Sequence, residues 1–138
     1  LGLQSTAHGP KEPITITYTD KTHPITQGLE GWKTINEELY NNVSILGGKA
    51  LASGHQIVPP KAKKGEKLPE DAKPTQATSV VAWTNEYGPN KTKVFSTSLG
   101  HNTETVADAR YLDLITRGLL WATGHIDENG KAKDGYGK

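Results

Sequence analysis

The fold of this chain is decided by residues 93–124, which read KVFSTSLGHNTETVADARYLDLITRGLLWATG. The residues up to Leu99 are rich in β-branched side chains, a composition typical of a strand. Gly100 ends this strand, and a polar loop that begins with His101 and Asn102 follows it. Because ligands of open α/β sheets bind at the carboxyl ends of the strands, the sequence predicts a site at this loop.

A helix over residues 108–123 is predicted after the loop. Asp108 is a good N-cap residue, since its carboxylate can accept from the free amides of the first turn. Gly124 can adopt the left-handed conformation that ends many helices. The apolar residues that recur at helical spacing, and that we expect to be buried, are Tyr111, Leu114, Ile115, Gly118, Leu119 and Ala122. Strand, loop and helix together indicate one half of an α/β unit.

Further strands are predicted upstream of this unit. Residues 14–20, ITITYTD, alternate between apolar and polar side chains, which is typical of a strand with one buried face. Residues 43–53 are expected to form a strand that bends at Gly47-Gly48. Residues 79–87 and 92–99 predict a β-hairpin, because a Gly-Pro-Asn turn joins two β-rich segments.

Five segments resemble, in order, the carboxyl-terminal signature of the ThuA-like, or trehalose-utilisation, family. They are HPITQGL at 23–29, EELY at 37–40, VAWTNEYG at 81–88, KVFSTSLGH at 93–101 and DARYLDLITRGLLWATG at 108–124. The resemblance implies an α/β fold, namely part of a flavodoxin-like sandwich similar to the class I glutamine amidotransferases. In this chain the sandwich would carry a β-hairpin and a long carboxyl-terminal helix.

The composition of the chain suggests a domain with two exposed segments. Residues 1–124 are expected to be the carboxyl-terminal part of a ThuA-like domain, beginning with a loop over residues 1–10. Residues 56–78 hold four prolines and several lysines but few large apolar side chains, so they predict an exposed insertion. Residues 125–138 are expected to be a flexible tail or linker. The chain begins at Leu1 and lacks both methionine and the family's first half, so we expect a missing amino-terminal half or another chain to complete the fold.

Composition also excludes several classes of function. The net charge of +1 provides no bulk electrostatic attraction to nucleic acid, and no apolar segment is long enough to span a membrane. The absence of cysteine excludes thiolate catalysis, thiolate metal sites and disulfides. The motifs of nucleotide-binding loops, serine hydrolases and zinc proteases are missing, so the cofactor stays unknown and a metal stays open. The sequence also allows a homo-oligomer, and we favour a periplasmic or secreted location over the cytoplasm.

Three residues remain as candidate catalytic groups: His101, Glu38 and His8. Imidazole can move a proton near neutral pH, and a carboxylate can orient it or hold a sugar hydroxyl. Glu38 is chosen over Glu37 because it aligns with the acidic residue that precedes a Leu-Tyr pair in the family. The candidate substrate-binding residues are Asn102, Thr97 and Tyr40.

The resemblance implies a carbohydrate context, in which relatives act in the use of trehalose and of keto-disaccharides. The first hypothesis is an enzyme domain that processes such a sugar by acid–base chemistry of His101 and Glu38. The alternative is a non-catalytic carbohydrate-binding or scaffolding module of a larger multidomain protein. A third hypothesis, metal-assisted chemistry, needs ligands that the sequence does not place together.

Overall fold

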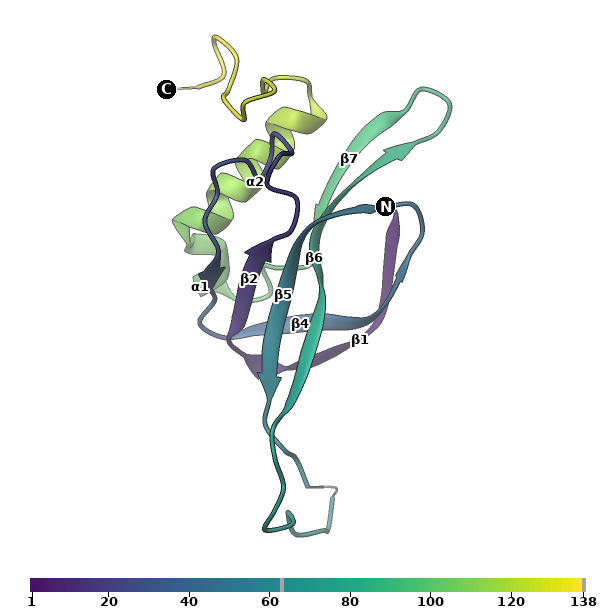
Figure 1. The fold of residues 1–138 in the computed structure, drawn as a ribbon, viewed down its shortest axis with the longest axis vertical. Coiled ribbons are helices and arrows are strands. Elements are labelled where there is room, and N and C mark those ends of the chain that lie inside the picture. Colours follow the sequence, from purple (N-terminus) through teal and green to yellow (C-terminus); the bar gives the residue numbers. More distant parts are fainter. Residues whose placement is uncertain (63, 138) are drawn as a thin grey trace.

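The computed structural model describes residues 1–62 and 64–137 of the chain as a mixed α/β structure in which strands dominate (Figure 1). The described strands are β1 Leu3–Glu12, β2 Ile14–Tyr18, β3 Trp32–Lys33, β4 Glu37–Ile45, β5 Lys49–Val58, β6 Thr75–Tyr87 and β7 Thr92–Thr97. The described helices are α1 Thr103–Ala107 and α2 Ala109–Ala122. Residues 63 and 138, which fall in the predicted insertion and tail, lie outside the described residues.

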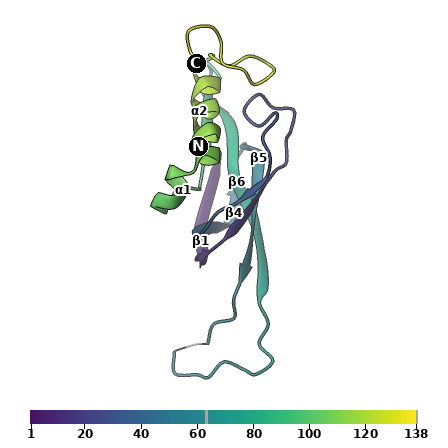
Figure 2. The ribbon, with the colours of Figure 1, turned by 90° about the vertical axis from the view of Figure 1, so that its left-hand side faces the viewer.

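The strands form two sheets with antiparallel pairing. The larger sheet has the order β3-β2-β5-β6-β7, and β1 pairs only with β4 in a second, two-stranded sheet. The β1–β4 ribbon crosses one face of the larger sheet (Figure 1). Helix α2 lies against the larger sheet beside β7 (Figures 1 and 2). The described strands include no parallel pair, so this part of the chain shows a mixed α/β fold but not the flavodoxin-like sandwich.

The core lies between the two sheets and α2. Its fully buried aliphatic side chains are Ile14, Ile16, Ile25, Leu39, Leu51, Val81 and Leu114. Strand β2 follows the predicted alternation, because Ile14 and Ile16 are buried whereas Thr15 and Thr17 are exposed. Gly54 of β5 leaves room for core side chains of both sheets, since an added Cβ would lie 2.7 Å from Ile14 and Val81 of its own sheet and 3.1 Å from Leu39 of β4.

Helix α2 begins and ends as predicted. Asp108 is its N-cap and accepts from the backbone N–H of Arg110, and Gly124 follows the helix with φ +78°. The buried face holds Leu114 and Gly118, but the expectation that Leu119 is buried is wrong, since this residue is 63% exposed. Strand β7 is the last strand of the sheet, so none of the described strands lies beyond it to cover Leu119.

The hairpin of β6 and β7 is confirmed, with Tyr87 paired to Thr92 around the predicted turn. The segment 43–53 is not one bent strand. Strand β4 ends at Ile45 in the small sheet, and β5 begins at Lys49 in the large sheet, so Gly47-Gly48 lies in the turn between two strands. Local sequence cannot show this change of sheet, because it depends on long-range pairing.

Residues 1–10 are not a loop, because β1 occupies most of them. Their glycine and proline are unfavourable in a strand, but pairing with β4 outweighs that local preference. The sequence pattern also does not predict the short helix α1.

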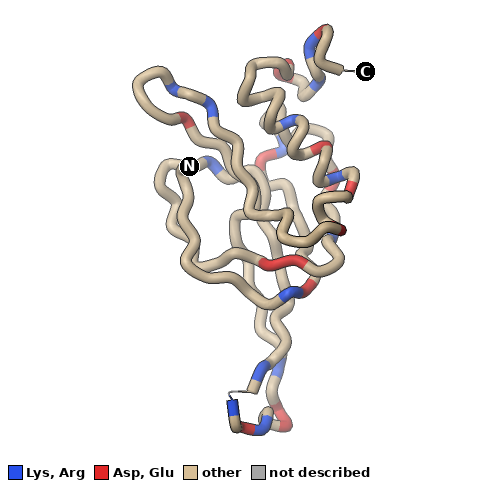
Figure 3. Tube along the Cα trace, turned by 180° about the vertical axis from the view of Figure 1, so that it is seen from behind, with Lys and Arg blue, Asp and Glu red and all other residues tan. Residues whose placement is uncertain are grey.

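The exposed insertion is shorter than the predicted 56–78. Strand β5 continues to Val58 and β6 begins at Thr75, so the connection spans residues 59–74. Its described residues, 59–62 and 64–74, project away from the sheets and include both basic and acidic side chains (Figure 3). The tail also has local order, because Ile126 is buried and bridges to Ala132. No helix in the described part of the chain is long and apolar enough to cross a membrane.

Candidate functional site

The structure brings the three candidate catalytic residues together from distant parts of the chain. His8 lies on β1, Glu38 lies on β4, and His101 lies in the loop between β7 and α1. Glu38 Oε2 is 3.6 Å from His8 Nδ1 and 3.5 Å from His101 Nδ1. These distances are longer than hydrogen bonds but within the range of ion pairs. One carboxylate is therefore shared by two imidazoles.

The three side chains differ in their contact with solvent. The side chain of Glu38 is only 12% exposed, whereas those of His8 and His101 are 52% and 38% exposed. A ligand can therefore reach either imidazole directly, while the carboxylate lies behind them. This arrangement suits Glu38 to an orienting and charge-stabilising role.

The tautomer of neutral His8 follows from its hydrogen bond to the backbone. Its Nδ1 lies 2.9 Å from the carbonyl oxygen of Gly9. Because a carbonyl oxygen can only accept, Nδ1 carries the proton and Nε2 is left with a free lone pair. His8 in this state can accept a proton from a ligand through Nε2.

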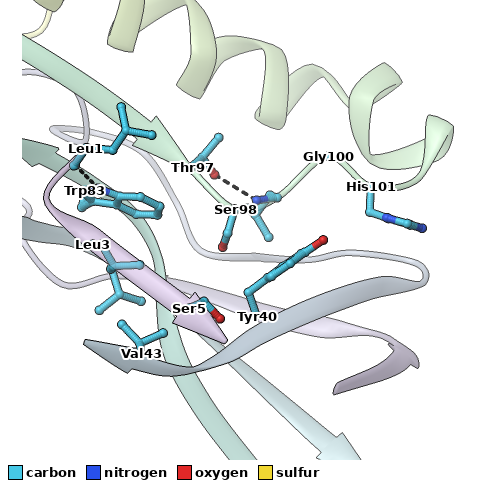
Figure 4. Close-up of a pocket in the computed structure, with 12 residues that line it drawn as sticks. Leu1, Leu3, Ser5, Tyr40, Val43, Trp83, Thr97, Ser98, Gly100 and His101 are labelled. Atoms are coloured by element: carbon cyan, nitrogen blue, oxygen red, sulfur yellow. Dashed lines mark hydrogen bonds between the residues drawn. The ribbon is translucent and has the colours of Figure 1, made fainter. Parts of the chain in front are cut away.

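A cavity of about 430 Å³ adjoins His101 and Tyr40 (Figure 4). Its volume is in the range of small-molecule sites. Its lining residues are Leu1, Leu3, Ser5, Tyr40, Val43, Val80, Trp83, Thr97, Ser98, Leu99, Gly100 and His101. Among the described residues, His101 and Tyr40 are the ionisable side chains that line the cavity. The walls thus combine apolar side chains with hydroxyl groups.

The candidate substrate-binding residues differ in their positions. Tyr40 lines the cavity, and its ring centroid lies 5.7 Å from that of His8. Thr97 also lines the cavity, but its hydroxyl already donates to the carbonyl of Val81 and accepts from the N–H of Leu99. Asn102 does not line the cavity, and its side-chain amide donates to the carbonyl of Asn36.

Glu37 is an important residue that the sequence pattern did not single out. Its carboxylate is fully buried and accepts three backbone N–H groups. The sequence does contain a signal for the burial of Glu37. Strand side chains alternate between faces, and Glu37 shares a face with the apolar Leu39. Glu38, the next residue, therefore points to the opposite face.

The arrangement of side chains does not indicate a metal centre. Among residues 1–62 and 64–137, no group of three or more His, Asp or Glu side chains is placed to hold a metal ion.

A larger cleft of about 680 Å³ lies elsewhere and contains none of the candidate site residues. His23 and Trp121 both line it, with their ring centroids 5.2 Å apart. Burial lowers the pKa of His23, which favours its neutral form. We prefer the smaller cavity, because His101, whose Nδ1 lies 3.5 Å from Glu38 Oε2, is part of its wall. His8 and Glu38 are not among its lining residues.

The fold and the site define a mixed α/β domain with an imidazole–carboxylate cluster at a cavity. This chain belongs to the ThuA family, described as trehalose utilisation, whose family model matches residues 1–122. The match includes all of the described strands and helices, and hence the whole candidate site. Comparisons with curated proteins and with solved structures give no match.

Proposed function

We propose that this domain acts on a carbohydrate, trehalose or a keto-disaccharide, by acid–base chemistry in the cavity beside His101. The observation that carries the proposal is the carboxylate of Glu38 placed within 3.6 Å of two imidazoles. The family's description as trehalose utilisation supports a sugar as the substrate.

In the proposed mechanism a neutral imidazole removes a proton from the sugar. The proton would come from a hydroxyl group or from the carbon next to a keto group. The imidazole then becomes positively charged, and the nearby negative charge of Glu38 stabilises it. The second imidazole, protonated beforehand, would give its proton to the product while the first keeps the proton taken from the sugar, so His8 and His101 would act as a base and acid pair.

The cavity walls support a neutral, hydroxylated ligand. Apolar side chains such as Leu3 and Trp83 can contact the C–H faces of a sugar ring. Ser98 also lines the cavity, and its buried hydroxyl has no hydrogen-bond partner among the described residues. In Figure 4 this hydroxyl lies between the rings of Trp83 and Tyr40.

We also propose that an amino-terminal half, or another chain, completes a flavodoxin-like sandwich similar to the glutamine amidotransferases. A shallow apolar groove supports this proposal. It runs along the edge strand β7 and α2, where Phe95, Ile115 and the exposed Leu119 line it. A further strand and its side chains could cover that groove.

The test of the proposed function is the His101→Ala variant. Trehalose and a keto derivative of trehalose are supplied as substrates, and the product is followed by NMR. Loss of an acid–base group is expected to lower turnover by about 10²–10⁴-fold while the far-UV spectrum stays unchanged. His55→Ala is the matched control, because His55 on β5 lies outside this cavity and should leave turnover unchanged.

The alternative, a non-catalytic carbohydrate-binding or scaffolding module, has a distinct outcome. The wild-type protein would then bind the sugar without any turnover, and His101→Ala would weaken that binding. Equal turnover in the wild type and in His101→Ala would contradict the proposed role of His101.

A further inference from the structure

We infer that Glu37 and Gln56 are positioning residues, which together hold in register the three segments that carry His8, Glu38 and His101. Neither residue contacts the cavity, and both are fully buried. The importance of this register for catalysis rests on the proposed function. The register itself follows from hydrogen bonds that the structure shows.

Glu37 connects β4 to the loop that carries His101. Its Oε2 accepts from the N–H of Gly100 at 3.2 Å, and its Oε1 accepts from the N–H of His101 at 3.2 Å. Oε1 also accepts from the N–H of Glu38 at 3.0 Å. The backbones of Glu38 and His101 are thus bound to one carboxyl group, which places their side chains next to each other.

The burial of this carboxylate makes the contact costly to lose. A buried charge is tolerated only when it is well paired or hydrogen-bonded. No basic side chain forms an ion pair with Glu37 in the described part of the chain, so backbone N–H groups are its partners. Hydrogen bonds to an ionised acceptor are stronger than those between neutral groups. The loop is therefore held by charge-assisted bonds.

Gln56 of β5 connects the larger sheet to both strands of the β1–β4 ribbon. Its Nε2 lies within hydrogen-bond distance of the carbonyls of Pro10 at 3.0 Å, Glu12 at 3.1 Å and Glu37 at 3.1 Å. Because the amide has two N–H groups, one of them is shared between two of these carbonyls. The first two carbonyls adjoin the irregular pairing of β1 that lies between His8 and Lys11. Gln56 thereby fixes the part of β1 that follows His8.

Gly9 provides an independent indication of this contact. A Cβ at Gly9 would lie only 2.4 Å from Oε1 of Gln56, so a larger residue after His8 would displace the end of the Gln56 side chain from its present position. The two buried residues also meet, because Gln56 binds the carbonyl of Glu37. A continuous chain of hydrogen bonds therefore runs from β1 through Gln56 and Glu37 to His101.

The experiment compares Glu37→Gln and Gln56→Met with a control, Thr26→Val. Glu37→Gln replaces one acceptor oxygen with a donor that opposes a backbone N–H, and Gln56→Met keeps the volume but removes all three donated bonds. Thr26 is equally buried and its hydroxyl also bonds to the backbone, but it lies in the turn after β2. Two measurements are made on each variant. The first is steady-state kinetics, which gives kcat and KM, and the second is the position of the imidazole signals in proton–carbon NMR spectra recorded without substrate.

We expect both variants to lower kcat by about 10²-fold with little change in KM, because misplacement of about 1 Å has an effect of that size. Glu37→Gln should move the imidazole signals of His101, and Gln56→Met those of His8. Thr26→Val should lower the stability but leave kcat and both sets of signals unchanged. Glu37→Asp, which keeps the charge with a shorter reach, should give a smaller displacement of the His101 signals.

Unchanged signals of His8 and His101 in folded variants would overturn the inference, as would displacements of equal size in Thr26→Val. Because these signals are read without substrate, they remain decisive if the wild type proves to have no turnover. Failure of the proposed function is therefore distinguishable from failure of the positioning role. Gln56→Met suffices for the test if neither Glu37 variant folds.

Discussion

Two consecutive carboxylates on β4 have different environments and different roles. Glu37 points into the core and binds backbone N–H groups, whereas Glu38 points outward to His8 and His101. Strand geometry explains this division, because successive side chains lie on opposite faces. At the scale of single residues, burial rather than residue type thus separates a positioning group from a candidate catalytic group.

The same distinction between buried and exposed positions applies to two leucines of α2. Leu114 is fully buried and belongs to the core, whereas Leu119 is largely exposed. Leu114→Ala should lower the free energy of unfolding by about 2–5 kcal/mol, because it leaves a cavity. Leu119→Ala should change it by less than about 0.5 kcal/mol. Urea unfolding of the two variants measures both values, and equal losses would contradict the placement of the helix.

At the scale of elements, α2 is positioned by its ends and by one close contact with the sheet. Gly118 faces Phe95 of β7, and an added Cβ would lie 2.1 Å from the phenyl ring. Asp108 defines the beginning of the helix, and its carboxylate also forms two hydrogen bonds with the side chain of Arg110. The loop with His101 and the short helix α1 therefore connect a fixed strand to a fixed helix.

The cap of α2 has a predicted pH dependence. Hydrogen bonds from the Arg110 side chain lower the pKa of Asp108 to about 2. A carboxyl group whose pKa is lower in the folded state than in the unfolded state stabilises the fold above its unfolded pKa, about 3.9, and loses that effect as the pH falls through the folded value. The wild type should therefore be more stable than Asp108→Asn at pH 7, by a small amount since the pair is partly exposed.

This advantage should disappear as the pH falls from about 4 to about 2. Thermal unfolding of both proteins at a series of pH values measures it, and effects common to both proteins cancel in the difference. Asp108→Asn keeps an acceptor for the N–H of Arg110, so the comparison isolates the charge. A difference that stays constant over this pH range would contradict the ion-paired cap.

At the scale of the whole molecule, the site lies where three separate segments meet. The β1–β4 ribbon provides His8 and Glu38, and the chain that leaves the larger sheet at β7 provides His101. Gln56 joins the two sheets beneath these residues. Because each segment is bound to another by buried polar contacts, the site depends on the assembled fold rather than on any one motif.

The parts that could be predicted from sequence are those with strong local signals. Alternation in β2, the Gly-Pro-Asn turn of the hairpin and the capping residues of α2 depend on near neighbours, and the structure agrees with them. The catalytic candidates came from the family resemblance together with the strand–glycine–loop pattern. The pairing of β1 with β4 and the hydrogen bonds from the loop of His101 to the Glu37 carboxylate could not be predicted, because both depend on contacts between distant residues.

Binding of the sugar beside His8 and His101 can be tested directly with the five histidines of the chain. Their imidazole signals are followed by proton–carbon NMR during titration of the wild type with trehalose and with its keto derivative. We predict saturable changes at His8 and His101, with His55 and His125 unchanged. Saturable changes at His23, which lines the larger cleft, with constant signals from His8 and His101, would contradict binding beside His8 and His101.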